Sequence, residues 1–213
     1  MAIDDLLDEH EQSERVRNWL KNNGAGLIGG IALGLALIFG WKWWVQHRDQ
    51  QAQAGYAAYA EAVKAIGGDD LKQAQAKVAA LREASPQSLY AQLAVLELAQ
   101  AQVKAKHPDA ALATLKQVAT DSPMKPYADL HAARLLNAAG KPEDAVKLLS
   151  SYDSPSALEV RGDALVQAGK LEEARDTYLK AMTGMDVASP QRRIVAIKLT
   201  HAGGTPPGSA ESI

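Results

Sequence analysis

The chain has 213 residues, with 23 Lys and Arg against 25 Asp and Glu and a formal net charge of -2. This balance argues against a nucleic-acid-binding protein, because such proteins need a basic face to neutralise phosphates. The chain has no cysteine, which excludes disulfides, thiolate metal sites, thiol catalysis and a lipid-modified cysteine. Beyond residue 50 it is rich in Ala, Leu, Lys, Gln and Glu, which enter helices readily, so we expect an all-α protein.

Residues 1–23 are interpreted as a cytoplasmic amphipathic segment that leads into an apolar stretch. Glu11 can pair with Arg15 one helical turn later. The acidic residues of this segment lack the glycine turn of a calcium-binding loop, so we interpret them as solvated charge. A docking site for a cytoplasmic partner is the alternative.

Residues 24–45 are predicted to form a transmembrane helix, because the 18 residues from Gly24 to Trp41 carry no charge. A buried core helix would be shorter, and a cleaved signal peptide would have a short basic region before its apolar part. All four tryptophans flank the stretch, as expected for side chains that anchor a helix at both bilayer interfaces. They are Trp19, Trp41, Trp43 and Trp44.

The charges around the predicted span indicate its orientation only weakly. Three cations precede it and two follow it, which is a slight bias towards a cytoplasmic N-terminus. Export of the long C-terminal part with a short N-terminus held in the cytoplasm is the simpler route, and we predict that orientation, with the opposite one left open.

Within the span, Gly26, Gly30 and Gly34 recur every four residues and therefore share one helix face. Such a pattern lets a second helix backbone approach closely. We predict that this face packs against a helix of another protein or of a second copy, although glycine is frequent in membrane helices in any case.

Residues 46–202 are predicted to form a tetratricopeptide-like α-solenoid of helical hairpins. In the clearest unit, Gly162 lies in the first helix, Gly169 ends it, and Ala174, Tyr178 and Ala181 share one face of the second helix. The same pattern recurs upstream with spacings of 37, 34 and 29 residues, near the tetratricopeptide period, and predicts three or four repeats. Its anchoring alanines are Ala74, Ala111, Ala145 and Ala174.

Tetratricopeptide arrays line a concave groove with the first helix of each hairpin, and we predict that Tyr127, Arg134 and Asn137 contact a partner there. Leu96 and Leu130 share the predicted face but are expected to belong to the core. The same projection places further residues toward the groove, namely Leu93, Gln100, Glu159 and Asp163.

The final helix is predicted to begin at Ser189-Pro190 and to close the open end of the array with Ile194, Ile197 and Leu199. Residues 203–213 are expected to form a flexible tail.

The sequence offers no constellation that would support catalysis, so we predict that the protein is not an enzyme and has no cofactor, metal or small-molecule substrate. Its five histidines are scattered, without the spacing of a metal-binding pair, and there is no nucleophile elbow or phosphate-binding glycine loop. The predicted function is therefore protein binding.

The chain resembles, over essentially its whole length, the ancillary SecYEG translocon subunit family (the YfgM type) of Gram-negative bacteria, and its N-terminal third is the specific portion. The residues that carry the resemblance are Glu11-Gln12, Val16 to Lys21, Asn22-Asn23-Gly24, Gly40-Trp41 and Gly55-Tyr56.

The resemblance implies a single-pass inner-membrane protein with periplasmic repeats that associates with the Sec translocon and with a membrane-anchored periplasmic chaperone of the PpiD type. Protein clients in export would be its further partners. The alternative is a membrane-anchored assembly adaptor unrelated to secretion, whose repeats could face the cytoplasm.

Overall fold

The computed structural model describes residues 2–68 and 70–207, with side chains from residue 13 on. Throughout these residues the regular structure is helical, which confirms the predicted all-α class. The helices are α1 (Ala2–Ile66), α2 (Leu71–Ala84), α3 (Leu89–Lys104), α4 (Pro108–Leu115), α5 (Lys125–Ala138), α6 (Pro142–Leu148), α7 (Pro155–Gln167), α8 (Leu171–Thr183) and α9 (Pro190–His201).

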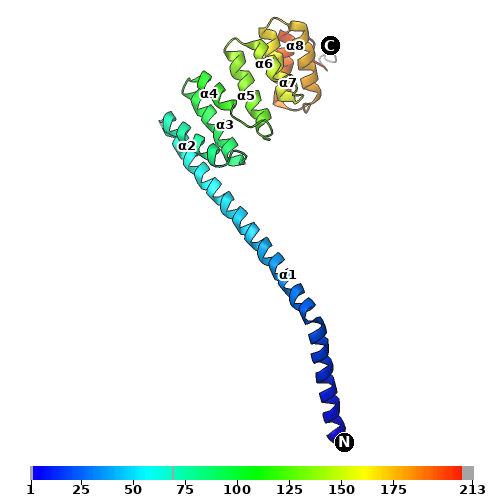
Figure 1. Ribbon diagram of the computed structural model, residues 1–213. Coiled ribbons are helices and arrows are strands. Elements are labelled where there is room, and N and C mark those ends of the chain that lie inside the picture. The colour runs from blue at the N-terminus through cyan, green and yellow to red at the C-terminus, as the bar shows by residue number, and fades with distance from the viewer. Residues whose placement is uncertain (1, 69, 208–213) are drawn as a thin grey trace. The chain divides into compact units, whose positions relative to one another are not determined.

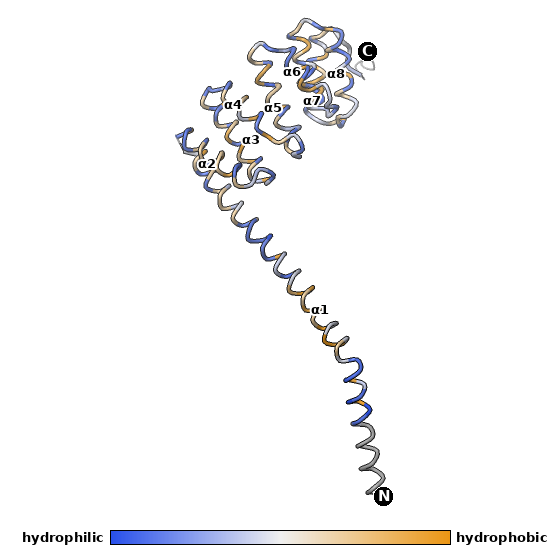
Figure 2. Tube along the Cα trace, viewed as in Figure 1, coloured by the Kyte–Doolittle hydropathy of each residue, from blue (hydrophilic) through white to orange (hydrophobic). Residues whose placement is uncertain are grey.

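Helix α1 is one continuous helix of 65 residues that contains the predicted membrane segment. It is the one helix among the described residues that is long and apolar enough to cross a membrane, with a mean hydropathy of 1.9 in its most apolar window. Figure 2 shows this apolar stretch between two hydrophilic ones. The chain divides into two compact units, residues 1–54 and residues 55–213, so the last part of α1 belongs to the second unit.

The second unit consists of helical hairpins that follow one another along the chain. Helices α3 and α4, α5 and α6, and α7 and α8 contact each other as pairs, and Figure 1 shows them stacked in chain order. The last part of α1, from Gly55 on, forms a hairpin with α2: Glu61 and Lys77 form an ion pair at 2.8 Å, and Ala62 and Ala74 belong to the same core cluster. The described residues thus contain four hairpins, followed by α9.

Each hairpin is closed by two small residues at a fixed separation. The predicted alanine of every second helix is completely buried, at Ala74, Ala111, Ala145 and Ala174. Twelve residues earlier, the first helix carries a buried small residue, at Ala62, Ala99, Ala133 and Gly162. Small side chains at these positions let the two helix backbones approach closely. The twelve-residue relation holds in the first hairpin too, which identifies the end of α1 as its first helix.

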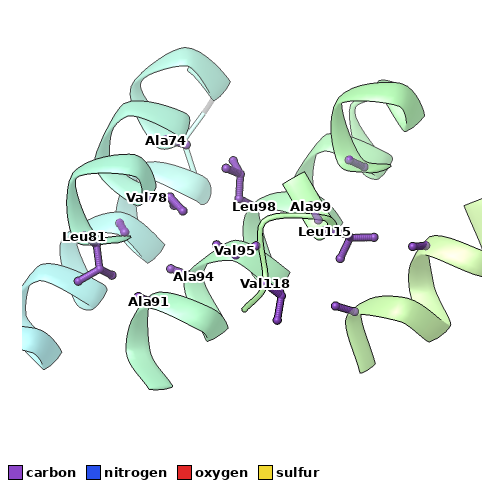
Figure 3. Packing of buried hydrophobic residues seen from close by; sticks show 14 residues of the cluster. Ala74, Val78, Leu81, Ala91, Ala94, Val95, Leu98, Ala99, Leu115 and Val118 are labelled. Atoms are coloured by element: carbon purple, nitrogen blue, oxygen red, sulfur yellow. The ribbon is translucent and has the colours of Figure 1, made fainter. Parts of the chain in front are cut away.

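The core runs through the array rather than forming a single centre. Figure 3 shows the part between α2 and α4, where Val78, Leu81, Val95 and Leu98 interdigitate between the alanines. Two further clusters continue it, one around Leu149 and one around Tyr178. Each hairpin therefore buries its apolar face against its neighbours, as expected of a solenoid.

Local signals in the sequence mark where these helices begin and end. Asp70 caps α2 by accepting hydrogen bonds from the backbone N–H groups of Lys72 and Gln73. Ser189 caps α9 in the same way through the N–H of Gln191. Gly169 follows α7 with a φ of 77°, the left-handed conformation that glycine adopts at little cost.

Lys106 occupies the corresponding left-handed position after α3, with a φ of 63°. Replacing Lys106 with glycine is therefore expected to stabilise the protein by about 0.5–1 kcal/mol, because the strain of a side chain at positive φ is relieved. Urea unfolding followed by circular dichroism would measure the change. The matched control is Gly169→Ala, which introduces the same strain after α7 and should destabilise; equal midpoints for Lys106→Gly and the wild type would contradict the expectation.

Helix α9 packs on α8, but with a different face from the one predicted. Val195 and Leu199 are completely buried in the last core cluster, whereas Ile194 and Ile197 are 46% and 58% exposed. The prediction was right for Leu199 and wrong for the two isoleucines, because the packing stripe of α9 runs through positions four residues apart, 195 and 199. Of the predicted tail, residues 208–213 lie outside the described part of the chain.

Candidate functional site

The glycine face of α1 is open within the chain. A Cβ atom built on Gly26, Gly30 or Gly34 meets no other atom within 4 Å. The glycines are therefore not needed for packing against any described part of this chain. Their use as a contact for another membrane helix stays a prediction.

The four tryptophans are exposed on α1, between 49% and 69%. After the apolar stretch, Trp41 lies against Trp44 with ring centroids 5.5 Å apart, and Trp43 stacks on His47 at 5.5 Å. The guanidinium of Arg48 lies 5.1 Å from the Trp44 ring centroid, within the range of a cation–π contact. This end of the apolar stretch thus carries the amphipathic aromatic and cationic groups that favour a membrane–water interface. Their role as anchors stays a prediction.

The first helices of the four hairpins, which we call the A helices, are residues 55–66 of α1 together with α3, α5 and α7. One side of each, the A-helix face, is formed by the residues 18, 15, 11 and 8 positions before the anchoring alanine, a spacing that keeps them on one side of a helix. These residues are Tyr56, Tyr59, Val63 and Ile66; Leu93, Leu96, Gln100 and Val103; Tyr127, Leu130, Arg134 and Asn137; and Ser156, Glu159, Asp163 and Val166.

The three predicted contact residues lie together on the A-helix face of α5. Tyr127 is 59% exposed and Arg134 is also exposed. Asn137 is half-buried, and its Oδ1 atom is buried with no hydrogen-bond donor among the described residues. Leu130, like Leu96 on α3, packs against the core, as expected. The face therefore offers an exposed aromatic ring and a cation to a partner, whereas the amide oxygen of Asn137 is buried.

The sequence interpretation missed an aromatic cluster at the first hairpin. The ring of Tyr90 on α3 lies 5.8 Å from that of Tyr56 and 5.6 Å from that of Tyr59. Tyr59 donates a hydrogen bond from its hydroxyl to the carboxylate of Glu97. The spacing of Tyr56 and Tyr59 relative to Ala74 equals that of Tyr127 and Leu130 relative to Ala145, and this repeat signal could have found them.

At the last hairpin the predicted groove carboxylates are already engaged by α9. Lys198 donates to Glu159 Oε1 at 2.6 Å and to Asp163 Oδ2 at 2.7 Å, and the hydroxyl of Tyr178 donates to Asp163 Oδ1 at 2.7 Å. Gln191 also donates to Glu159. Burial alone would lower the pKa of Lys198, but the hydrogen bonds to Asp163 and Glu159 outweigh it and raise the pKa. The expectation that these two carboxylates face an open groove is therefore wrong.

High pH is expected to destabilise the repeats through two half-buried phenols, Tyr59 and Tyr152. The hydrogen bond to Glu97, with burial, raises the pKa of Tyr59 to about 12, and burial, with the hydrogen bond to Asp129, raises the pKa of Tyr152 to about 12. Because both values lie above the ordinary 10.0, this stability is complete below pH 10 and is lost as the pH rises towards 12.

Urea unfolding at about pH 8 and about pH 11 would measure this loss. A double variant with Tyr59→Phe and Tyr152→Phe should lose less stability between the two pH values than the wild type. An unchanged loss in the double variant would assign the alkaline sensitivity to other groups.

No group of three or more His, Asp or Glu side chains in the described part of the chain is arranged to hold a metal ion. The described residues instead form two surfaces that could make contacts, an apolar helix and a repeat array with an aromatic and cationic face.

A family model described as "Tetratricopeptide repeat-like domain" matches residues 17–204. Two curated relatives are both described as "Ancillary SecYEG translocon subunit". The one from Escherichia coli (strain K12) is 29% identical over 203 residues, which cover 91% of this chain and 96% of the relative. The one from Haemophilus influenzae (strain ATCC 51907 / DSM 11121 / KW20 / Rd) is 25% identical over 183 residues, which cover 82% of this chain and 89% of the relative. The resemblance predicted from the N-terminal third is thereby confirmed.

Proposed function

Because this chain belongs to the tetratricopeptide repeat-like domain family, we propose that it is a membrane-anchored, non-catalytic scaffold that joins the Sec translocon to a periplasmic chaperone of the PpiD type. The observation that carries the proposal is the span of the similarity. Two relatives described as ancillary SecYEG translocon subunits match this chain over most of its length, and the family model matches residues 17–204, which include the apolar segment and the repeats.

In this proposal the two parts of the chain have separate tasks. Helix α1 holds the protein in the inner membrane with its N-terminus in the cytoplasm, and its open glycine face lies against a translocon helix. The A-helix face binds a chaperone or an exported protein on the periplasmic side, with Tyr127, Arg134 and Asn137 among the contacts.

Purification of the tagged protein from its native membrane in a gentle detergent tests the proposal. We expect translocon subunits and a periplasmic chaperone to be retained. Replacing Gly26, Gly30 and Gly34 with leucine should reduce the translocon yield, whereas Ala32→Leu, on the opposite side of the helix, should not. Recovery of a different membrane assembly would instead support an adaptor outside secretion.

Orientation and repeat function need measurements of their own. Protease added to intact spheroplasts should digest the repeats, and protection of the repeats would contradict a periplasmic location. A photo-crosslinking amino acid at Tyr127, which is 59% exposed, should capture a protein in living cells. The control position is Lys72 on the second helix of the first hairpin, where we expect no such product.

A further inference from the structure

The A helices carry charges of both signs, and every carboxylate among them has a donor within the described part of the chain, whereas only some of the cations have a partner there. Their carboxylates are Glu61, Glu97, Asp129, Glu159 and Asp163. Glu61 pairs with Lys77, and Glu97 accepts the Tyr59 hydroxyl. Every carboxylate on these four helices has a donor from this chain.

The three remaining carboxylates lie deeper and have more than one donor between them. Asp129, which is 6% exposed, accepts from Lys125 at 2.5 Å and from Tyr152 at 2.7 Å. Glu159 and Asp163 share Lys198 of α9, as described above. None of these oxygens would gain by meeting an ammonium group of a partner, because a cation of this chain already lies against each site.

Of the cations on the same helices, Lys125 pairs with Asp129 and Arg161 donates to backbone carbonyls, but three others have no such partner in the part of the chain that the structure describes. Within the described residues, Arg134, Lys64 and Lys104 have no carboxylate at ion-pair distance and no side-chain hydrogen bond, and all three are exposed. Arg134 lies on the A-helix face, four residues from Leu130 and three from Asn137. Lys104 follows Val103, the last residue of that face on α3, whereas Lys64 is turned about 100° around α1 from Val63 and lies off the face.

In the first three hairpins the rest of the face is apolar or aromatic, apart from Gln100 and Asn137. Tyr56 and Val103 are 57% and 43% exposed, and Tyr127 is 59% exposed. In the last hairpin, the two carboxylates of the face, those of Glu159 and Asp163, are bound by Lys198. An incoming segment thus meets exposed apolar surface on α1, α3 and α5 and the unpaired guanidinium of Arg134 on α5.

From this asymmetry we infer that the A-helix face selects a polypeptide segment that combines apolar side chains with carboxylates, one of which pairs with Arg134. The inference rests on the proposed function, since it gives the chemistry of the partner that the scaffold binds. Opposite charge across an interface suppresses partners with the wrong sign, and here a basic segment would face unpaired cations.

The test uses the full chain in nanodiscs of zwitterionic lipid and a set of short fluorescein-labelled amphipathic peptides. The peptides share one apolar face of Phe and Leu and differ only in their polar residues, which are Glu, Gln or Lys. Fluorescence anisotropy measures their affinities, and empty nanodiscs measured in parallel report adsorption to lipid.

We expect the Glu peptide to bind about 3- to 5-fold more tightly than the Gln peptide, which is the size of an exposed ion pair. The Lys peptide should bind more weakly than both, and the differences should shrink as salt is raised from about 50 to about 500 mM. Arg134→Gln should bring the Glu peptide to the affinity of the Gln peptide. Lys72→Gln, which removes a charge from the second helix of the first hairpin, should leave the ratio unchanged.

Two results would overturn the inference, and they differ in what else they overturn. Equal affinities for the Glu and Gln peptides, or tighter binding of the Lys peptide, would remove the charge selection but leave the scaffold standing. Failure of all three peptides to bind, together with no crosslinks from position 127 in cells, would overturn both the inference and the peptide-binding role of the repeats.

Discussion

Gly162→Ala is expected to lower the free energy of unfolding of the repeat unit by about 3 kcal/mol. A Cβ atom on Gly162 would lie 2.4 Å from the nearest ring carbon of Tyr178 and within 3.0 Å of two more. The ring cannot yield easily, because Tyr178 is 2% exposed and its hydroxyl is bound to Asp163. The last hairpin would have to open, with loss of the core packing around it.

Gly55→Ala is the matched control for this substitution. Gly55 also lies inside a helix, but a Cβ there would meet its nearest side-chain atom, on Tyr90, at an ordinary 3.5 Å. The change should therefore be neutral or stabilise by up to about 1 kcal/mol through helix propensity. Chemical unfolding of both variants measures the difference. Tyr178→Leu in the Gly162→Ala background should restore part of the loss; similar midpoints for the two alanine variants would refute the close approach of α7 and α8.

Lys198→Met is expected to destabilise the protein by about 2–3 kcal/mol, because it leaves the buried carboxylate of Glu159 without its cation. The side chain of Glu159 is 7% exposed, whereas that of Lys198 is 29% exposed. This partial exposure places the expected loss below the range of about 3–5 kcal/mol for a fully buried pair. Urea unfolding followed by circular dichroism would measure it.

Lys180 supplies a control with the same residue type and nearly the same geometry. It pairs with Asp153 at 2.7 Å, but the two side chains are 56% and 71% exposed. Lys180→Met should therefore cost at most about 1 kcal/mol, as exposed ion pairs do. Glu159→Gln in the Lys198→Met background should recover much of the loss by removing the stranded charge. If the two lysine variants were equally stable, the contact of Lys198 with Glu159 and Asp163 would have no special role in attaching α9 to the last hairpin.

Local signals in the sequence determined most of the helices. The uninterrupted apolar run predicted the membrane-length helix, and the Ser189 cap marked where α9 begins. The recurring alanines predicted the repeats, because each lies where the two helices of a hairpin approach closely. The packing positions of Gly162, Ala174 and Tyr178 could be predicted for that reason, and all three are buried.

The predicted groove contacts depend on residues that are far apart in the sequence, so they were harder to predict. The sequence placed Tyr127, Arg134 and Asn137 on one helix face, which needs only helical periodicity. It also placed Glu159 and Asp163 on an open face, and there it failed. Lys198, their partner, is 39 residues from Glu159, on a helix that the repeat pattern does not include.

The sequence by itself determined the helical class, the apolar anchor, the repeat period and the small residues at which helices cross, because all of these are set by contacts within one hairpin. Only the tertiary structure decided that the end of α1 serves as the first A helix, that α9 neutralises the last one, and which A-helix cations stay unpaired. Those outcomes depend on how successive hairpins stack, and stacking brings together side chains whose separation along the chain follows no fixed period.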